Sequence, residues 1–358
     1  WRCRQAPFLA FQESLSVSDA TPNESFLQCH SRDVVERLIR QMEEGTGPFL
    51  KPWDARVDLG LPMNPTTGKS YRGGNLLHLW ALQSAWDTQD NRWMTYKQAA
   101  AVGAQVRKGE KASVIEYWDW SPVEEAKKSG DPDLIAKAYP KVFFPRVFNA
   151  MQIDGLPALV LPAPRPEPDV HQACEAVLND SGAEIHHDGG NQAFYRPMTD
   201  SIHLPQRNTF HSASGYYATA LHELGHWTGF PTRLNRDQKG AFGSIDYAKE
   251  ELVAEVSSML MGERLGIGHD PTQHAAYVKS WIQILRDDPR ELFRAAAAAE
   301  RVVEFLKVPE LVREPLPKVE QERQLVAANQ QELEKPNGTK ARTKAREKTR
   351  RRNHVMVV

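Results

Sequence analysis

The stretch His222-Glu223-Leu224-Gly225-His226 is the feature from which the fold and chemistry of this chain are predicted. Residues four apart on a helix share one face, so both imidazoles can reach the same cation. Glu223 lies beside them, where a carboxylate can take a proton from a water held at a metal. Tyr217, Leu221 and Leu224 supply an apolar face. The stretch therefore predicts a buried helix whose other side lines a metal-containing cleft.

A zinc ion that keeps one position for water needs a third protein ligand. A further histidine at the spacing H-E-x-x-H-x-x-G-x-x-H is absent, because Thr232 occupies that position. The other solution is a carboxylate on a later helix, and Glu251 and Glu255 share one face of the predicted helix 246–265. This segment resembles the E-x-x-A-[DE] helix of Glu-type zincins. The resemblance implies that Glu251 binds the metal and Glu255 supports a ligating histidine, with Glu255 as the competing ligand.

Composition and charge restrict the class of protein. The 358 residues are 41% apolar and 25% charged, which suits a packed core. No run of 18 or more apolar residues exists and no signal peptide is recognised, so we expect no membrane partner. The three cysteines form no C-x-x-C pair, which fits a reducing cytoplasm and argues against a thiolate zinc site. The formal net charge of −1 means that any nucleic-acid site is a local patch.

The first half of the chain interleaves basic and aromatic residues in irregular segments. Proteins hold single strands with a cationic groove and aromatic platforms for the bases, and such binding weakens with salt. A tryptophan alone is more often a core residue, and a lysine or arginine alone is more often solvated, so only the interleaving favours DNA. The candidate DNA-binding residues are Lys51, Trp53, Lys69, Tyr71, Arg72, Asn75, Trp93, Tyr96, Lys97, Arg107, Lys108 and Lys111.

A proline-rich run divides the chain. Residues 161–169 hold four prolines in nine positions, which is typical of a stiff polyproline linker. Because such a linker buries little surface, we expect weak coupling across it. The predicted organisation is a leader 1–30, a first domain 31–160, a linker 161–170, a second domain 171–308 and a polar, basic, disordered tail 309–358.

The spacing of apolar and capping residues predicts where the helices and strands lie. Ser31 and Asn75 are expected to cap two helices, and Thr95 with Gln98 forms a capping box for a short third one. The charged segment 121–140 is expected to be an excursion on a hairpin. Further helices are expected near 170–180, 213–229, 246–265, 272–286 and 290–306, and strands near 113–120, 141–149, 183–187, 193–196 and 200–204.

Longer strings in both halves resemble the ArdC-type antirestriction proteins of conjugative plasmids and their relatives among plasmid primase-associated proteins. The resemblance covers about residues 31–308. It implies an N-terminal domain that binds single-stranded DNA, a C-terminal zincin-like domain, and a role in protecting incoming mobile-element DNA from restriction. Gly74 departs from the family, which usually carries an apolar residue there, and we expect it to loosen the loop. The matching strings lie at 51–53, 64–75, 93–99, 106–111, 217–229, 233–236 and 247–255.

The prediction is an α+β protein with a small mixed α/β domain that binds single-stranded DNA, followed by a zincin-like metallopeptidase domain. Zn²⁺ is expected at His222, His226 and Glu251, with Glu223 as the general base toward a peptide bond of an unidentified protein. Two alternatives stay open. One is a DNA-binding, primase-associated accessory protein with a non-catalytic metal site, and the other is a regulatory metallopeptidase that cleaves a DNA-bound protein.

Overall fold

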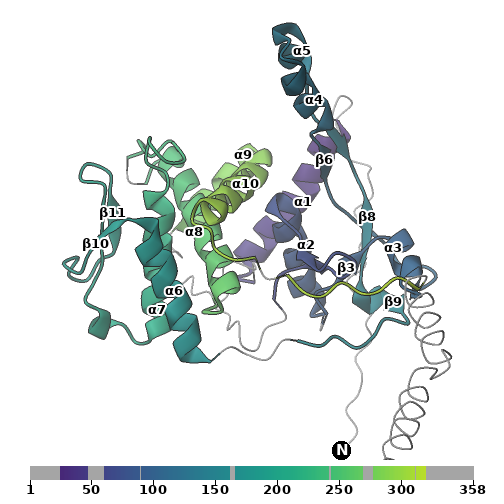
Figure 1. Ribbon diagram of the computed structural model, residues 1–358, viewed down its shortest axis with the longest axis horizontal. Helices are drawn as coiled ribbons and strands as arrows, with labels where there is room; N and C mark the ends of the chain where they lie inside the picture. The colour runs from purple at the N-terminus through teal and green to yellow at the C-terminus, as the bar shows by residue number, and fades with distance from the viewer. Residues whose placement is uncertain are drawn as a thin grey trace, which may run out of the picture.

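The computed structural model describes residues 25–46, 60–88, 90–161, 166–241, 243–268, 277–310 and 312–319. Helices and small sheets alternate along the chain, so the α+β prediction is confirmed (Figure 1). None of the described helices combines the length and the apolar character needed to cross a bilayer. The predicted DNA-binding residues Lys51 and Trp53 lie outside the described residues, as do the leader up to residue 24 and the stretch 320–358.

The metal-binding half is built around helix α8 (Ile245–Leu265), which contacts α7 (Ala213–Trp227) and α10 (Arg290–Phe305). Because both neighbours cover it, most of α8 from Glu250 to Glu263 is buried. Helices α6 (Glu167–Ser181) and α9 (Val278–Asp287) complete this layer. All of these helices were predicted, with boundaries that differ by a few residues.

A three-stranded sheet packs against α7. Strands β10 (Glu184–His186), β12 (Ser201–His203) and β11 (Phe194–Arg196) lie in the order β10-β12-β11. β10 runs parallel to β12, whereas β11 is antiparallel to it. Ile202 in the central strand is fully buried in the same core cluster as α7. The three strands lie within the ranges predicted from the sequence, near 183–187, 193–196 and 200–204.

The N-terminal half combines three helices with several short antiparallel pairs. Strand β8 (Arg146–Asn149) lies between β3 (Trp93–Met94) and β5 (Ser113–Val114). The remaining pairs are β1 (Met63–Asn64) with β2 (Lys69–Ser70), and β4 (Gln105–Val106) with β9 (Ile153–Asp154). The helices are α1 (Phe26–Glu43), α2 (Gly73–Trp86) and α3 (Tyr96–Ala101).

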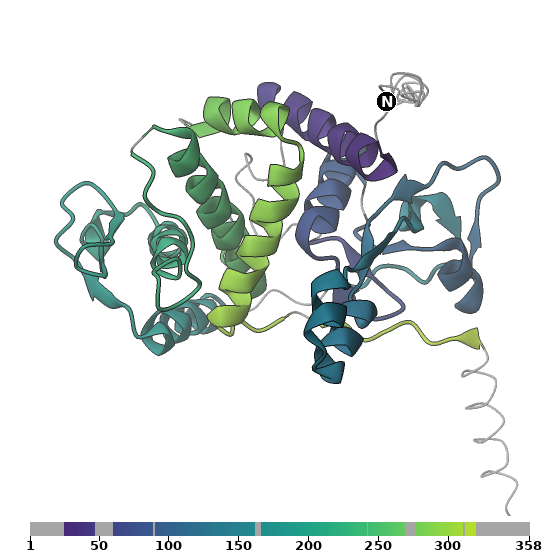
Figure 2. The ribbon, with the colours of Figure 1, turned by 90° about the horizontal axis from the view of Figure 1, so that it is seen from above.

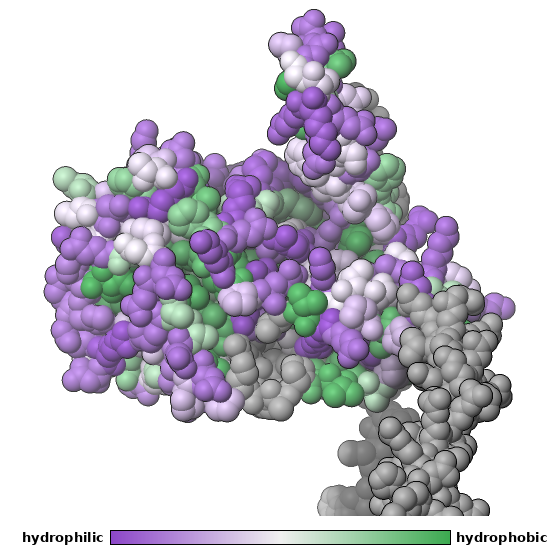
Figure 3. Space-filling model, viewed as in Figure 1, coloured by the Kyte–Doolittle hydropathy of each residue, from purple (hydrophilic) through white to green (hydrophobic). Residues whose placement is uncertain are grey.

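A helical arm projects from this half, as Figures 1 and 3 show. Strands β6 (Tyr117–Asp119) and β7 (Lys141–Phe143) pair antiparallel and carry α4 (Ser121–Ser129) and α5 (Pro132–Lys137) between them. The excursion predicted at 121–140 is therefore confirmed.

Two predicted helix caps are wrong. α1 begins at Phe26, because Ser25 and Gln28 form a capping box, and Ser31 instead donates its hydroxyl to Leu27 O inside the helix. α2 begins at Gly73, so Asn75 lies within its first turn. The capping box of Thr95 and Gln98 is confirmed, since both of its hydrogen bonds are present. It could be predicted because a capping box is a local sequence pattern.

The two halves share one core, which contradicts the expected weak coupling. Apolar residues of α1 and α2 belong to the same buried cluster as those of α7 to α10. Polar contacts close the boundary: Arg290 Nη1 donates to Glu116 Oε1 at 2.6 Å, and Arg72 Nε donates to Glu300 Oε2 at 3.2 Å. Figure 2 shows purple α1 and blue α2 alongside the green helices. The two halves are therefore coupled by direct packing, and this coupling does not depend on the linker.

Gly74 marks a close approach between the halves. A Cβ atom there would lie 2.1 Å from Cδ1 of Phe293, so the ring occupies the space of the missing side chain. The expected loosening is therefore wrong. We predict that Gly74→Ala lowers the free energy of unfolding by about 1–3 kcal/mol, because overpacking forces neighbouring groups to shift. Denaturation followed by fluorescence and circular dichroism should show one cooperative transition that moves as a whole.

The control is a double-mutant cycle with Phe293→Leu, which opens space at the same contact. The cost of Gly74→Ala should be smaller in the Phe293→Leu background. Two separate transitions, with only the first half affected, would contradict the shared core.

Candidate functional site

Helices α7 and α8 bring three ligand donors together. One donor atom each from His222, His226 and Glu251 lie within 4.8 Å of one another. His222 Nε2 is 3.5 Å from Glu251 Oε2, and His226 Nε2 is 3.5 Å from Glu251 Oε1. Within the described ranges this is the one group of three His, Cys, Asp or Glu side chains with such convergence. The three residues are those predicted from the sequence.

The outer nitrogen of each imidazole faces a second carboxylate. His222 Nδ1 lies 3.5 Å from Glu255 Oε2, and His226 Nδ1 lies 3.2 Å from Glu250 Oε1. A carboxylate at Nδ1 fixes the ring and leaves Nε2 for a metal. Glu255 therefore lies where a supporting carboxylate is expected. Because Glu251 faces both Nε2 atoms whereas Glu255 faces an Nδ1 atom, the geometry favours Glu251 over Glu255 as the third ligand.

Glu250 is a site residue that sequence reasoning missed. Arg236 donates to it twice, from Nε to Oε2 at 2.9 Å and from Nη2 to Oε1 at 2.7 Å. Gln238 Nε2 adds a bond of 3.0 Å to Oε1. Burial alone would raise the pKa of Glu250, but Arg236 and His226 lower it to about 2. The signal was present, since Glu250 and Arg236 both lie in strings that match the family.

We predict that Glu250→Gln weakens metal binding by about 10–100-fold, the usual cost of losing a supporting carboxylate. The variant keeps the size of the side chain but removes the charge that holds His226. Metal affinity is measured by competition with a chromogenic chelator. Glu291→Gln on α10, which removes a carboxylate paired with Arg294, is the matched control. Wild-type affinity in Glu250→Gln would contradict a positioning role.

The electrostatics of the site fit a divalent cation. Four carboxylates, those of Glu223, Glu250, Glu251 and Glu255, are buried and act electrostatically on the two ligand imidazoles. Buried charge is costly unless it is compensated. Burial would lower the pKa of each ligand imidazole, yet the carboxylates raise the pKa of His222 to about 9 and of His226 to about 10. Groups that stabilise positive charge on buried imidazoles also stabilise a bound cation, and two nitrogens with one carboxylate oxygen suit zinc.

Two tyrosines border Glu251, and neither was singled out from the sequence. The hydroxyls of Tyr247 and Tyr277 lie 3.3 Å apart. Burial, followed by hydrogen bonding to Glu251 and Tyr277, raises the pKa of Tyr247, so its phenol stays protonated. Tyr247 precedes Glu251 by one helical turn, a spacing from which the contact could have been predicted. Tyr277 belongs to no local motif.

Four predicted DNA-binding residues make contacts within the fold, and one of these predictions, Trp93 as a platform for a base, is wrong because its side chain is fully buried. Trp93 is fully buried and donates Nε1 to Gln83 Oε1 at 3.0 Å, so neither face of its ring is open to a base. Tyr71 donates its hydroxyl to Trp93 O at 3.0 Å. Asn75 exchanges two hydrogen bonds with the backbone of Glu116, and Arg72 bonds across the boundary between the halves.

The other described candidates, like Arg72, are exposed, and three of them line a groove. Tyr96, Arg107 and Lys108 border this open depression of about 570 Å³. Lys97 and Lys111 are exposed and adjacent in sequence to groove residues, whereas Lys69 lies apart in β2. The remaining lining residues are Gln105, Val106, Glu110, Phe148 and Asp154.

The fold and site together define a zincin-like metallopeptidase domain joined to a second domain. A family model for zincin-like metallopeptidases matches residues 172–298. A model for the N-terminal domain of the anti-restriction factor ArdC matches residues 30–144.

Solved structures and curated relatives identify the family. The Mn(II)-bound crystal structure of the antirestriction protein ArdC from plasmid R388 is 36% identical, with a TM-score of 0.61, over 77% of this chain and 96% of that chain. The protein y4eC of Sinorhizobium fredii (strain NBRC 101917 / NGR234), described as uncharacterized, is 36% identical over 284 residues, 76% of this chain and 90% of its own length. This chain belongs to the ArdC antirestriction family.

Two DNA primases named TraC, from Escherichia coli, match more strongly over part of their length. Each is 53% identical, over 287 and 290 residues, which is 76% of this chain in both cases. The match spans 19% of one primase and 26% of the other. The chain therefore corresponds to about a fifth to a quarter of these primases.

Proposed function

We propose that this protein is an antirestriction factor that binds Zn²⁺ at His222, His226 and Glu251 and binds single-stranded DNA through its N-terminal half. The observation that carries the proposal is the convergence of both Nε2 atoms on Glu251. A metal-bound relative, ArdC of R388 with Mn(II), supports a divalent ion in the family. The choice of zinc follows from the nitrogen and carboxylate donors. A cytoplasmic location stays a prediction.

Three protein ligands favour catalysis over a structural role, because structural zinc sites are closed by four. Glu250 and Glu255 contact the Nδ1 atoms, away from the shared face. Bound Zn²⁺ would supply Lewis acidity toward a substrate carbonyl. Glu223, buried on the same helix as the two imidazoles, accepts the proton of the attacking water and passes it to the leaving amine. Tyr247 orients Glu251 by hydrogen bonding to it.

The groove at α3 and β4 supports the nucleic-acid part of the proposal. Tyr96 is 51% exposed and offers an aromatic face beside Arg107 and Lys108. Such a pairing of a stacking ring with cations binds single strands without reading their sequence.

A primase-associated accessory protein is the second candidate. The 53% identity to two primases over most of this chain favours it. In that case the protein binds single-stranded DNA and metal but cleaves no peptide bond.

The test of metal and DNA binding uses the full chain, because α1 and α2 bury their apolar faces against the other half. Mass spectrometry of the purified protein should find about one zinc per chain. Fluorescence anisotropy should show that it binds a labelled oligothymidine more tightly than duplex, with affinity falling as salt rises.

Lys108→Gln should weaken binding and reduce the salt dependence by about one phosphate contact. Lys127→Gln on the projecting arm is the matched control. Equal affinity of both variants would contradict the groove as the DNA site, and a preference for duplex would contradict the single-strand proposal.

A further inference from the structure

The two-stranded ribbon at the base of the arm exposes aromatic rings. β6 and β7 form this ribbon, and Tyr117 lies opposite Phe143 in its register. The centroids of the two rings are 6.3 Å apart. Tyr117 is 58% exposed and Phe143 is 50% exposed. Because contact of a large ring with water is unfavourable, two neighbouring open rings favour a surface that contacts another molecule.

A third ring continues the same face. Tyr139 is 75% exposed and lies two residues before Lys141, the first residue of β7. The chain approaches β7 in an extended form, since Ala138 has a ψ of 131°. Side chains two residues apart on an extended chain point to the same side, about 7 Å apart. Tyr139, Lys141 and Phe143 therefore present a ring, a cation and a ring along one side of the ribbon.

The opposite face attaches the ribbon to the body of the protein. Trp118 lies opposite Val142 and donates Nε1 to Glu116 Oε2 at 2.9 Å. Arg290 Cζ, from α10, is 5.9 Å from the centroid of the Trp118 ring. Because successive side chains alternate between the two faces, the face of Tyr117 points away from this contact. Figures 1 and 3 show that the arm stands clear of the rest of the molecule.

The charge of this segment suits a polyanion. Residues 137–148 contain three cations and neither Asp nor Glu. The cations are Lys137, Lys141 and Arg146, and all three are exposed. Binding of a nucleic acid requires such cations, because each one placed at a phosphate releases a counterion.

One carboxylate faces this row of cations. Asp119 lies opposite Lys141 in the ribbon. Its Oδ1 accepts hydrogen bonds from Ser121 N at 3.0 Å and from Ser121 Oγ at 2.6 Å. Asp119 is therefore directed at the start of α4, and the ribbon keeps an excess of positive charge.

The ribbon and the groove lie at two ends of one extended segment. β7 leads through two residues into β8, and Phe148 of β8 lines the groove. Arg146 shares a face of β8 with Phe148, because the two residues are two positions apart. From Tyr139 to Phe148 the chain spans at most about 30 Å. A strand bound in the groove can therefore continue past Arg146 onto the ribbon.

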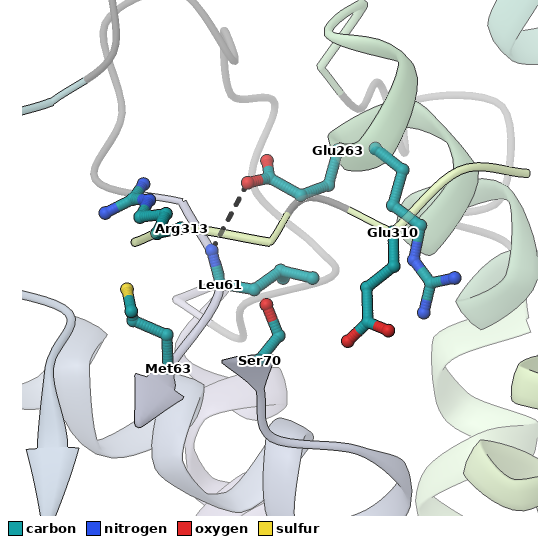
Figure 4. Close-up of a pocket in the computed structure, with 7 residues that line it drawn as sticks. Leu61, Met63, Ser70, Glu263, Glu310 and Arg313 are labelled. Atoms are coloured by element: carbon teal, nitrogen blue, oxygen red, sulfur yellow. Dashed lines mark hydrogen bonds between the residues drawn. The ribbon is translucent and has the colours of Figure 1, made fainter. Parts of the chain in front are cut away.

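A smaller cavity between the two halves is no alternative site for the strand. Leu61, Glu263 and Arg313 are among the residues that line it, and its volume is about 20 Å³ (Figure 4). Leu61 N donates to Glu263 Oε1 at 3.3 Å beside it. This volume holds about one water molecule and is too small for a base. A strand that leaves the groove therefore finds further contacts on the surface and not in this cavity.

We propose that the ribbon face with Tyr117, Tyr139 and Phe143 binds the same single strand of DNA as the groove. Bases stack on the exposed rings and phosphates contact Lys141 and Arg146, a combination that holds single strands without reading their sequence. Since one strand contacts both surfaces, the second contact is intramolecular and neither surface needs high affinity alone. This inference rests on the proposed DNA binding and adds contacts outside the groove.

The first test changes one ring of the full chain. Tyr139→Ala should weaken binding of an oligothymidine of about 16 nucleotides by about 5–150-fold, the cost of losing one stacked base. Tyr139→Trp keeps a ring and should bind like the wild type. Tyr139→Leu keeps apolar area without a ring and should bind like Tyr139→Ala. Leu134→Ala, which removes another half-exposed apolar side chain of the arm, is the matched control. Circular dichroism verifies that each variant is folded.

The second test measures the phosphate contacts. Lys141→Gln should lower the slope of log affinity against log salt by about 0.7, the value for one phosphate of a single strand. Lys141→Arg keeps the charge and should restore the slope. Arg146→Gln should behave like Lys141→Gln. Lys127→Gln on α4 is the control, because the two lysines of that helix are balanced by two glutamates.

The third test asks whether one strand covers both surfaces. Calorimetric titration should find one oligothymidine of about 16 nucleotides bound per chain. Tyr96→Ala in the groove and Tyr139→Ala on the ribbon should each weaken this single binding event. Two strands bound per chain would show two separate sites and overturn the continuous surface.

The outcomes separate this inference from the proposed function. If Lys108→Gln weakens binding but every Tyr139 variant binds like the wild type, the inference is overturned and the proposed function stands. If Tyr139→Leu binds like the wild type while Tyr139→Ala does not, the contact is apolar rather than stacked. That result would overturn the inference and favour a protein partner for the ribbon. If the wild type binds no single strand, the proposed function fails and this inference falls with it.

Discussion

Replacement of His222 or His226 by alanine is expected to weaken metal binding by more than about 100-fold relative to the wild type. This loss exceeds the 10–100-fold expected when a residue that only supports a ligand is replaced. Each change removes one of three donors that lie within 4.8 Å of one another. Dialysis followed by mass spectrometry measures the metal retained. His186→Ala, a histidine on β10 that lies 3.1 Å from Glu184, is the matched control. Full occupancy in both ligand variants would refute the site.

The same experiment decides between the two carboxylates. Glu251→Ala should lose metal as the histidine variants do, whereas Glu255→Ala should lose less because Glu255 faces an Nδ1 atom. The reverse ranking would make Glu255 the ligand.

Thermal unfolding gives an independent readout. A ligand that binds only the folded state stabilises it by about 4 kcal/mol when present at a thousand times its Kd. A chelator should therefore lower the melting temperature of the wild type but leave that of His222→Ala unchanged.

The grouping of the candidate metal ligands was predictable because most of the pattern is local in sequence. His222, Glu223 and His226 lie within one turn and a half of a helix, and Glu251 and Glu255 repeat that spacing on a second one. Helical geometry alone places such residues on one face. Tyr277 could not be found in this way, because only the packing of α9 against α8 brings it near Glu251.

The proposed DNA-binding surface was only partly predictable, since composition does not distinguish a buried aromatic side chain from an exposed one. Trp93 and Tyr96 lie three residues apart, yet one is fully buried and the other is half exposed. The burial of each ring depends on which face of β3 or α3 packs against the core. The shared core could not be predicted from the sequence either, because its contacts are long-range. Gly74 and Phe293, which meet there, are more than two hundred residues apart.

Glu223→Gln is expected to lower any peptidase activity by about 10²–10⁴-fold, the usual contribution of a general base. The amide keeps the size of the side chain but accepts no proton. Because both histidines and Glu251 are untouched, metal content and stability should match the wild type. A library of fluorogenic peptides measures hydrolysis, and Glu291→Gln controls for the lost charge. Undiminished hydrolysis would exclude Glu223 as the base.

DNA binding by the same variant tests whether the two activities are separable. The shared core gives a path by which a change at α7 could reach the N-terminal half, through α8, α10 and α2. However, Glu223→Gln changes no volume in that core, so affinity for single-stranded DNA should stay within twofold, about 0.4 kcal/mol.

Transfer of unmodified plasmid DNA into a restricting host then tests whether protection requires the metal site, DNA binding or both. Protection that survives Glu223→Gln would show that DNA binding is sufficient, whereas lost protection with intact DNA binding would make proteolysis part of the mechanism. Lost DNA binding by the folded variant would refute separability.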